Sequence, residues 1–266
     1  MMRKIVIHAG FHKTGTTSVQ SMLRENAPVL APHVRVLLKQ DFEDLTNKAR
    51  AFSIDPREKT LASVDRAATA FFDSLDLDDP RPILMSSEDL SGHMPGRHGL
   101  ECYDSAGLVM KCIADAARAR LGKTADVLFY FSTRARAPWL RSTWWQNLRS
   151  TRLTHDFASY CAQFDAARSL DDILAEVAAD VAPAGVMSFP LETASDLPLG
   201  PLEPLLALLD MPDLDRAVLR CLPAENVQPD IGIDRVFLAL NQSALPEQDV
   251  KAAKRMIRRM GRRATS

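Results

Sequence analysis

The sequence is poor in the residues that build metal centres and disulfide frameworks. Its four cysteines are widely spread over 266 residues, and none forms a C-x-x-C pair. This pattern excludes a disulfide framework and a thiolate zinc site, and it is typical of reduced thiols in the cytoplasm. The six histidines also lack the spacing of metal ligands. We therefore expect no metal site.

Strong net charge and long apolar runs are also absent. The formal net charge is −1, so no overall field attracts nucleic acid or membrane, and any anion site must be local. No apolar run approaches the length that crosses a bilayer, and the chain starts without the pattern of a secretory leader. These absences predict a cytoplasmic protein with no nucleic-acid partner and no integral membrane association.

The composition does supply enough apolar material for a folded core. Apolar residues make up 46% of the chain and charged residues 25%, which is ordinary for a globular protein. A chain of 266 residues fits one large α/β domain or two small ones.

The most informative stretch runs from Ile5 to Gln20. A β-branched run ends at His8, a loop with two glycines and a lysine follows, and an apolar helical pattern then begins. A strand, a Gly-rich turn and a helix start make an anion site, because the first free N–H groups of the helix point into the turn. Lys13 adds a positive charge, and hydroxyls come from Thr16, Thr17 and Ser18. The alternative is an ordinary strand–turn–helix corner with a solvated lysine.

The loop differs from a standard Walker A motif. Gly10 and Gly15 have the Walker A spacing, but Thr16 stands where the motif needs its lysine. The lysine is Lys13, and the order Lys-Thr-Gly-Thr-Thr resembles the 5′-phosphosulfate loop of the sulfotransferases that use PAPS (3′-phosphoadenosine 5′-phosphosulfate). The resemblance implies that the cofactor-binding residues here are His12, Lys13, Thr14, Gly15, Thr16, Thr17 and Ser18.

A second stretch, from Ile83 to Gly92, ends a buried-looking run in two serines and two acids. Ligands of open parallel sheets sit at the carboxyl ends of the strands, so we expect these residues at the same rim as the loop. Ser86-Ser87-Glu88 resembles a segment of the bacterial sulfotransferase branch, which implies Glu88 as the catalytic base. The alternative is that Ser87 or Asp89 caps the next helix and Glu88 is solvated. His93 is the second candidate base, or a surface histidine.

A third stretch follows a predicted strand at 126–132. Arg134 stands at its carboxyl end, and Pro138 suits the first turn of a new helix. On that helix one face is apolar and the other presents Ser142. An arginine with a serine eight residues later resembles the pair that holds the 3′-phosphate of PAPS. The chain departs from the bacterial pattern at Ala135, Arg136, Ala137 and Trp144. The alternative for Arg134 is a surface arginine paired with an acid.

The remaining chain continues the α/β pattern. We expect strands at 34–38 and 186–189, and helices within 41–77, 105–121, 157–180, 202–209 and from 237 onward. Glu225–Pro229 is a weak match to an Asn-x-Ser turn. Residues 251–263 carry seven basic residues, so we expect 250–266 to be a basic C-terminal tail helix, either solvated or in contact with an acidic acceptor or membrane surface.

The resemblance covers residues 5 to about 241. It implies a single domain over 1–266 with a P-loop NTPase-like three-layer α/β fold and a mainly parallel central sheet. It also implies transfer of a sulfuryl group from PAPS to a hydroxyl or amine of a small-molecule or carbohydrate acceptor, with PAP (adenosine 3′,5′-bisphosphate) as product and no metal. Two alternatives stay open: a P-loop nucleotide kinase or NTPase, for which Asp41 or Asp89 would bind magnesium, and a non-catalytic PAP(S)-binding relative.

Overall fold

The computed structural model describes residues 3–122, 125–223 and 232–264, with side chains to 260. The chain divides into two compact units, which are described separately. The first comprises residues 1–136 and 168–225, and the second comprises 137–167 and 226–266. The predicted single domain stays a prediction, and the match at Glu225–Pro229 lies outside the described residues. Among the described helices, none is both long and apolar enough to span a membrane.

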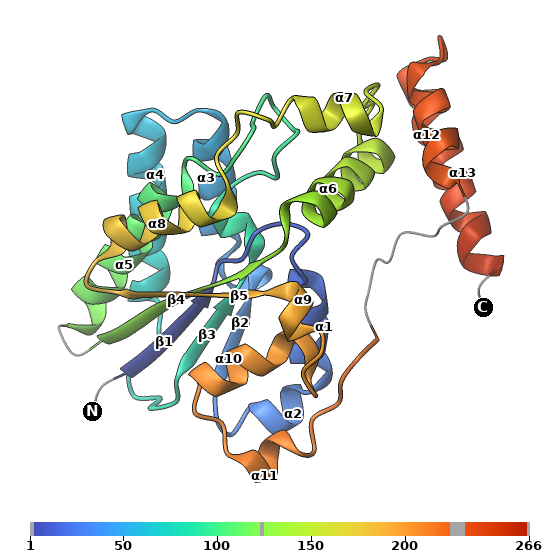
Figure 1. Cartoon of the computed structure of the whole chain (residues 1–266). Coiled ribbons are helices and arrows are strands. Elements are labelled where there is room, and N and C mark those ends of the chain that lie inside the picture. The colour runs from blue at the N-terminus through green and yellow to red at the C-terminus, as the bar shows by residue number, and fades with distance from the viewer. Residues whose placement is uncertain (1–2, 123–124, 224–231, 265–266) are drawn as a thin grey trace. The chain divides into compact units, whose positions relative to one another are not determined.

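The first unit is built on a sheet of five parallel strands in the order β2-β3-β1-β4-β5 (Figure 1). The strands are β1 (Arg3–His8), β2 (Arg35–Leu38), β3 (Ile83–Ser86), β4 (Ala125–Thr133) and β5 (Gly185–Pro190). β1 is central, and its last residue, His8, pairs with Ser86 of β3 and Tyr130 of β4. The strand expectations and the α/β class with a parallel sheet are confirmed.

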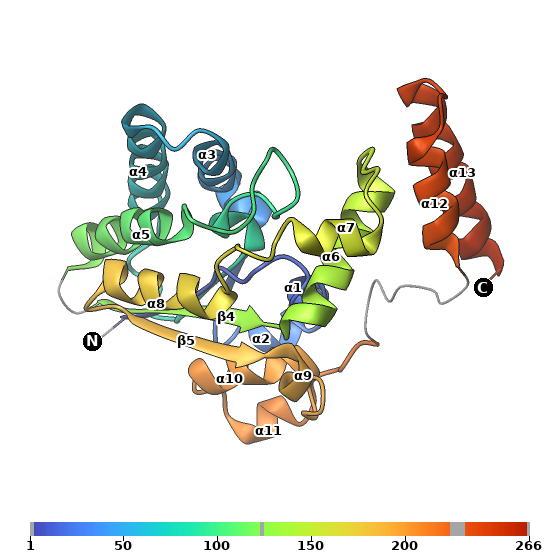
Figure 2. The same cartoon turned by 45° about the horizontal axis from the view of Figure 1, so that its top comes forward.

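Helices cover both faces of this sheet (Figure 1 and Figure 2). One face carries α1 (Thr16–Glu25), α2 (Ala27–Leu30) and α10 (Glu203–Leu208). The other carries α3 (Glu43–Ile54), α4 (Glu58–Asp73), α5 (Ala106–Leu121) and α8 (Leu170–Val181). The apolar stripe of α1 enters the core because Val19, Met22 and Leu23 are buried against leucines of the chain after β5.

Short elements complete the first unit. Three 3₁₀ turns and two small helices occur: η1 (Lys39–Phe42), η2 (Glu88–Ser91), η3 (Gly200–Leu202), α9 (Leu191–Ala194) and α11 (Asp213–Arg216). The helical stretch expected at 157–180 divides into α7 (Phe157–Ala162) and α8. The reason is local: Ser169 and Asp172 form a capping box that starts α8 afresh.

The second unit contains α6 (Arg136–Ser150) from residue 137 on, together with α7, α12 (Ile233–Gln242) and α13 (Glu247–Ala264). The rings of Trp145 and Phe237 stack with centroids 5.5 Å apart. Lys254 Nζ donates to the carbonyls of Leu148 and Thr151, both at 2.7 Å. The expectation of a solvated tail helix is therefore wrong at Lys254, which is buried because it donates to carbonyls at the end of α6 and directly after it.

Candidate functional site

The loop between β1 and α1 has the backbone geometry of an anion site. Gly15 is the N-cap of α1 with φ of 95°, and Lys13 also has a positive φ, 71°. The hydrogen bond from Val19 N to Gly15 O begins the backbone hydrogen bonds of α1. The N–H groups of the residues before Val19 therefore have no acceptor within the helix. Among the described residues no side chain caps the helix, and its first turn holds no acid. The positive end of the helix dipole therefore faces the loop.

Both loop glycines are required by close packing. A Cβ atom at Gly10 would lie 2.7 Å from Thr16 Cγ2 and 3.1 Å from His8 Nε2. A Cβ atom at Gly15 would lie 2.7 Å from Leu191 Cδ1. Since both positions also have positive φ, a larger residue would strain the backbone as well as the packing.

The loop hydroxyls divide into a buried and an accessible set. Thr14 is fully buried, its Oγ1 donates to Phe11 O at 2.6 Å, and it pairs with Ser132 Oγ of β4 at 2.7 Å. The Thr14 side chain therefore ties the loop to the sheet, and only its backbone is available for a ligand. Thr17 is exposed and Ser18 is half-buried, so these hydroxyls are accessible.

Arg134 follows β4 and contacts the loop directly. Its Nη1 donates to Lys13 O at 3.2 Å, and its Nε lies 3.9 Å from Glu192 Oε1. Burial lowers the pKa of the Arg134 guanidinium, and Glu192 opposes this shift. The resemblance implies that Arg134 and the loop hold the same nucleotide; in the structure the two segments are in contact. Ser142 lies partly buried on α6, in the second unit.

Glu88 is held at the same rim beside α1. Its Oε2 accepts a hydrogen bond from Gln20 Nε2 at 2.9 Å. The preceding Ser87 accepts from Asp89 N at 3.3 Å and so caps η2, as one of the two expectations for this segment stated. Ser91 Oγ donates to the Ala9 and Gly10 carbonyls, which fastens η2 to the loop.

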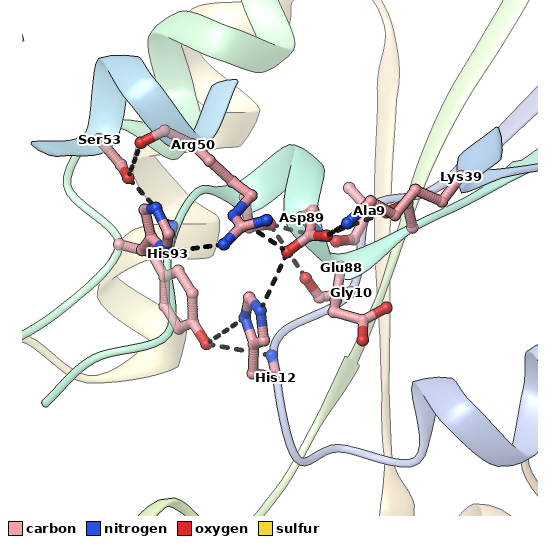
Figure 3. A network of polar contacts seen from close by, with 12 residues as sticks. Ala9, Gly10, His12, Lys39, Arg50, Ser53, Glu88, Asp89 and His93 are labelled. Carbon is pink, nitrogen blue, oxygen red and sulfur yellow. Dashed lines mark hydrogen bonds and ion pairs between the residues drawn. The ribbon is translucent and has the colours of Figure 1, made fainter. Parts of the chain in front are cut away.

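Asp89 is the centre of a charged network (Figure 3). Its carboxylate lies 2.5 Å from Lys39 Nζ, 3.4 Å from His12 Nε2 and 3.7 Å from Arg50 Nε. Burial raises the pKa of Asp89, but the contacts with His12 and Lys39 outweigh it and hold the pKa well below its ordinary range. The sequence gives no signal for this network, because Lys39 and Arg50 belong to no recognisable motif.

His12 is fixed between Asp89 and Tyr103. The backbone N–H of His12 donates to Tyr103 Oη at 3.0 Å, and its Nδ1 lies 3.2 Å from the same oxygen. The buried Tyr103 ring also packs on Phe11, with centroids 4.8 Å apart. His12 and its neighbour Lys13 are thereby held in place by a residue that sequence reasoning missed.

His93 lies on the far side of the network and is a poor base. Its backbone N–H donates to Ser53 Oγ at 3.0 Å, and its Nδ1 lies 3.5 Å from Arg50 Nη2. Burial, followed by the charges of Arg50 and His98, lowers the pKa of His93 to about 4. A histidine with this pKa is neutral at pH 7 and accepts protons weakly.

His8 is a buried neutral imidazole beneath the loop. It is fully buried, and its Nδ1 lies 2.9 Å from Ser86 Oγ. Its Nε2 has no hydrogen-bond partner among the described residues. Burial lowers the pKa of His8 to about 4. His8 therefore supports the loop through packing and is uncharged at neutral pH.

Comparisons with protein-family models, curated proteins and solved structures gave no match to this chain. Within the described ranges, no three His, Cys, Asp or Glu side chains gather as a metal site.

Proposed function

We propose that this protein is a PAPS-dependent sulfotransferase with a P-loop NTPase-like fold. The observation that carries the proposal is the hydrogen bond from Arg134 to Lys13 O, which joins the two segments that resemble the 5′- and 3′-phosphate sites of that family. The central position of β1 in the sheet adds support, because the loop that follows it lies where ligands bind in open parallel sheets.

The residues divide the work as follows. Backbone N–H groups from Thr14 to Thr17 hold the 5′-phosphate at the start of α1. Lys13 neutralises the charge that builds on the bridging oxygen of the leaving phosphate. Arg134 binds the 3′-phosphate, which a guanidinium suits through paired charge-assisted hydrogen bonds.

The reaction is an in-line transfer that parallels phosphoryl transfer. An acceptor oxygen or nitrogen forms a bond to the sulfur of PAPS, the bond from sulfur to the 5′-phosphate oxygen breaks, and PAP leaves. Glu88 takes the proton of the acceptor; Gln20 holds the Glu88 carboxylate for this task by a 2.9 Å hydrogen bond. The scheme needs no metal, because Lys13 and the start of α1 neutralise the charge of the leaving phosphate.

The kinase or NTPase alternative finds less support in the described residues. Asp89 already contacts three groups that can carry positive charge, so magnesium would have to displace them. Asp41 accepts a hydrogen bond from the backbone N–H of Leu38 and serves as a local cap.

We also propose a cytoplasmic location, which the four free cysteines support.

Thermal unfolding with nucleotides tests the proposal. PAP is expected to raise the melting temperature more than AMP or ATP does at equal concentration, because only PAP presents a 3′-phosphate to Arg134. Equal shifts with PAP and AMP would argue against a 3′-phosphate site. A larger shift with magnesium and ATP would favour the kinase alternative, and PAP binding without transfer to any acceptor would favour the non-catalytic one.

A further inference from the structure

We propose that Arg50 and Lys39 form a subsite for an anionic group, a carboxylate or a sulfate ester, on the acceptor molecule. The inference rests on the proposed function and gives it a substrate class: an acidic carbohydrate or a similar acidic small molecule. Lys39 begins η1 directly after β2, and Arg50 lies on α3. Both side chains reach Asp89, which adjoins the candidate base Glu88 in the chain.

The sheet order places this subsite on the acceptor side of the loop. Arg134 follows β4, on one side of β1, and Lys39 follows β2, on the other side beyond β3. A nucleotide held by the loop and Arg134 extends toward β4. Glu88 follows β3, so the base and the two cations lie together on the side that the nucleotide leaves open.

The charges of the subsite are unbalanced. Lys39 and Arg50 are permanent cations and share the single carboxylate of Asp89, so these three groups together carry one net positive charge. Glu88 does not compensate it, because in the structure its carboxylate contacts Gln20 and points away from Asp89 (Figure 3). His98 is exposed, and its ring centroid lies 4.7 Å from that of His93. An anion is the ligand that this excess charge attracts.

Arg50 has hydrogen-bond donors to spare. Its Nε is buried and has no hydrogen-bond partner among the described residues, since Asp89 at 3.7 Å is beyond hydrogen-bond range. Its contact with His93 Nδ1 is long, at 3.5 Å. The side chain is still 33% exposed. The exposed part of this guanidinium suits bidentate recognition of a carboxylate or sulfate.

The pKa of His93 responds to the positive charge of Arg50. Burial is the first cause that lowers its pKa to about 4, and the charge of Arg50 is the second. A bound anion next to Arg50 would offset that charge, so the pKa of His93 is expected to rise when the subsite fills. This response can be measured without turnover.

The test uses the full chain with saturating PAP and three probes: glucuronate, glucose 6-sulfate and glucose. Titrations followed by the NMR signals of the histidine rings give the affinities and the pKa of His93. Both acids are expected to bind about tenfold more tightly than glucose, the factor of one ordinary charge-assisted hydrogen bond. A preference for one acid over the other identifies the source of the charge as a carboxylate or a sulfate ester.

Variants connect this preference to the subsite. Arg50→Gln is expected to remove the tenfold preference, and Arg66→Gln, at an exposed arginine of α4, is the matched control that keeps it. Lys39→Gln, at a more exposed side chain, replaces Arg50→Gln if the latter does not fold. Equal binding of acids and glucose, or a preference that survives both variants, would overturn the inference. If PAP stabilises the protein but no acid is preferred, only the subsite fails; if PAP binds no better than AMP, the proposed function fails, whatever the acids do.

Discussion

Acid should destabilise the fold through His8, the buried imidazole under the loop. The pKa of an unfolded histidine is 6.5, and burial lowers that of His8 to about 4. Between these values the unfolded chain binds a proton that the folded chain excludes, so stability falls as pH falls. At about 1.4 kcal/mol per pH unit, the full effect is roughly 3 kcal/mol, and about 2 kcal/mol of it is lost between pH 7 and pH 5.

The assay is urea unfolding at several pH values between 7 and 5, with His8→Asn beside the wild type. Asparagine keeps a polar group near Ser86, so the variant can retain the local contact while it loses the titrating ring. His93, with a pKa also lowered to about 4, acts in the same direction in both proteins. The wild type should therefore lose about 2 kcal/mol more than the variant over this range. Equal losses would refute the assignment of His8 as a buried neutral base.

Three further substitutions test the loop and its neighbours. Lys13→Ala should lower turnover about a hundredfold or more while PAP affinity changes far less, as stopped assays and calorimetry would show; an unchanged rate removes Lys13 from the mechanism. Glu88→Gln should reduce transfer by about 10² to 10⁴ with an unchanged circular dichroism spectrum, and an active variant would redirect attention to other bases. Gly10→Ala should cost about 1–3 kcal/mol more in urea unfolding than Gly122→Ala, because both have positive φ but only Gly10 is crowded; equal costs would contradict the packing argument.

The loop was predictable because its determinants are local. A strand end, glycines at set positions, a lysine and a helix start all fall within residues 5–20, and their geometry follows from helix chemistry. The hydrogen bonding of the Thr14 hydroxyl was not predictable. Its hydroxyl turns inward to Ser132, a residue 118 positions away, and a motif that names Thr14 says nothing of that partner.

The charged network could not be predicted from the sequence either, because its residues are also far apart in the chain. Asp89 was visible as an acid after a strand, but Lys39 comes from η1, Arg50 from α3 and Tyr103 from the segment before α5. Only the folded sheet aligns the carboxyl ends of β1, β2 and β3. Pairings of this kind depend on tertiary packing, which periodicity and motif spacing do not encode.

The central feature of the proposed function is one nucleotide held by both the loop and Arg134. Calorimetric titration of PAP and AMP into the wild type, Arg134→Gln and Arg136→Gln measures this directly. Arg136, an exposed arginine close to Arg134 in the chain, serves as the control. We predict that PAP binds the wild type and Arg136→Gln at least about tenfold more tightly than AMP, and that Arg134→Gln loses this preference. Equal affinities of PAP and AMP for the wild type would contradict the central claim.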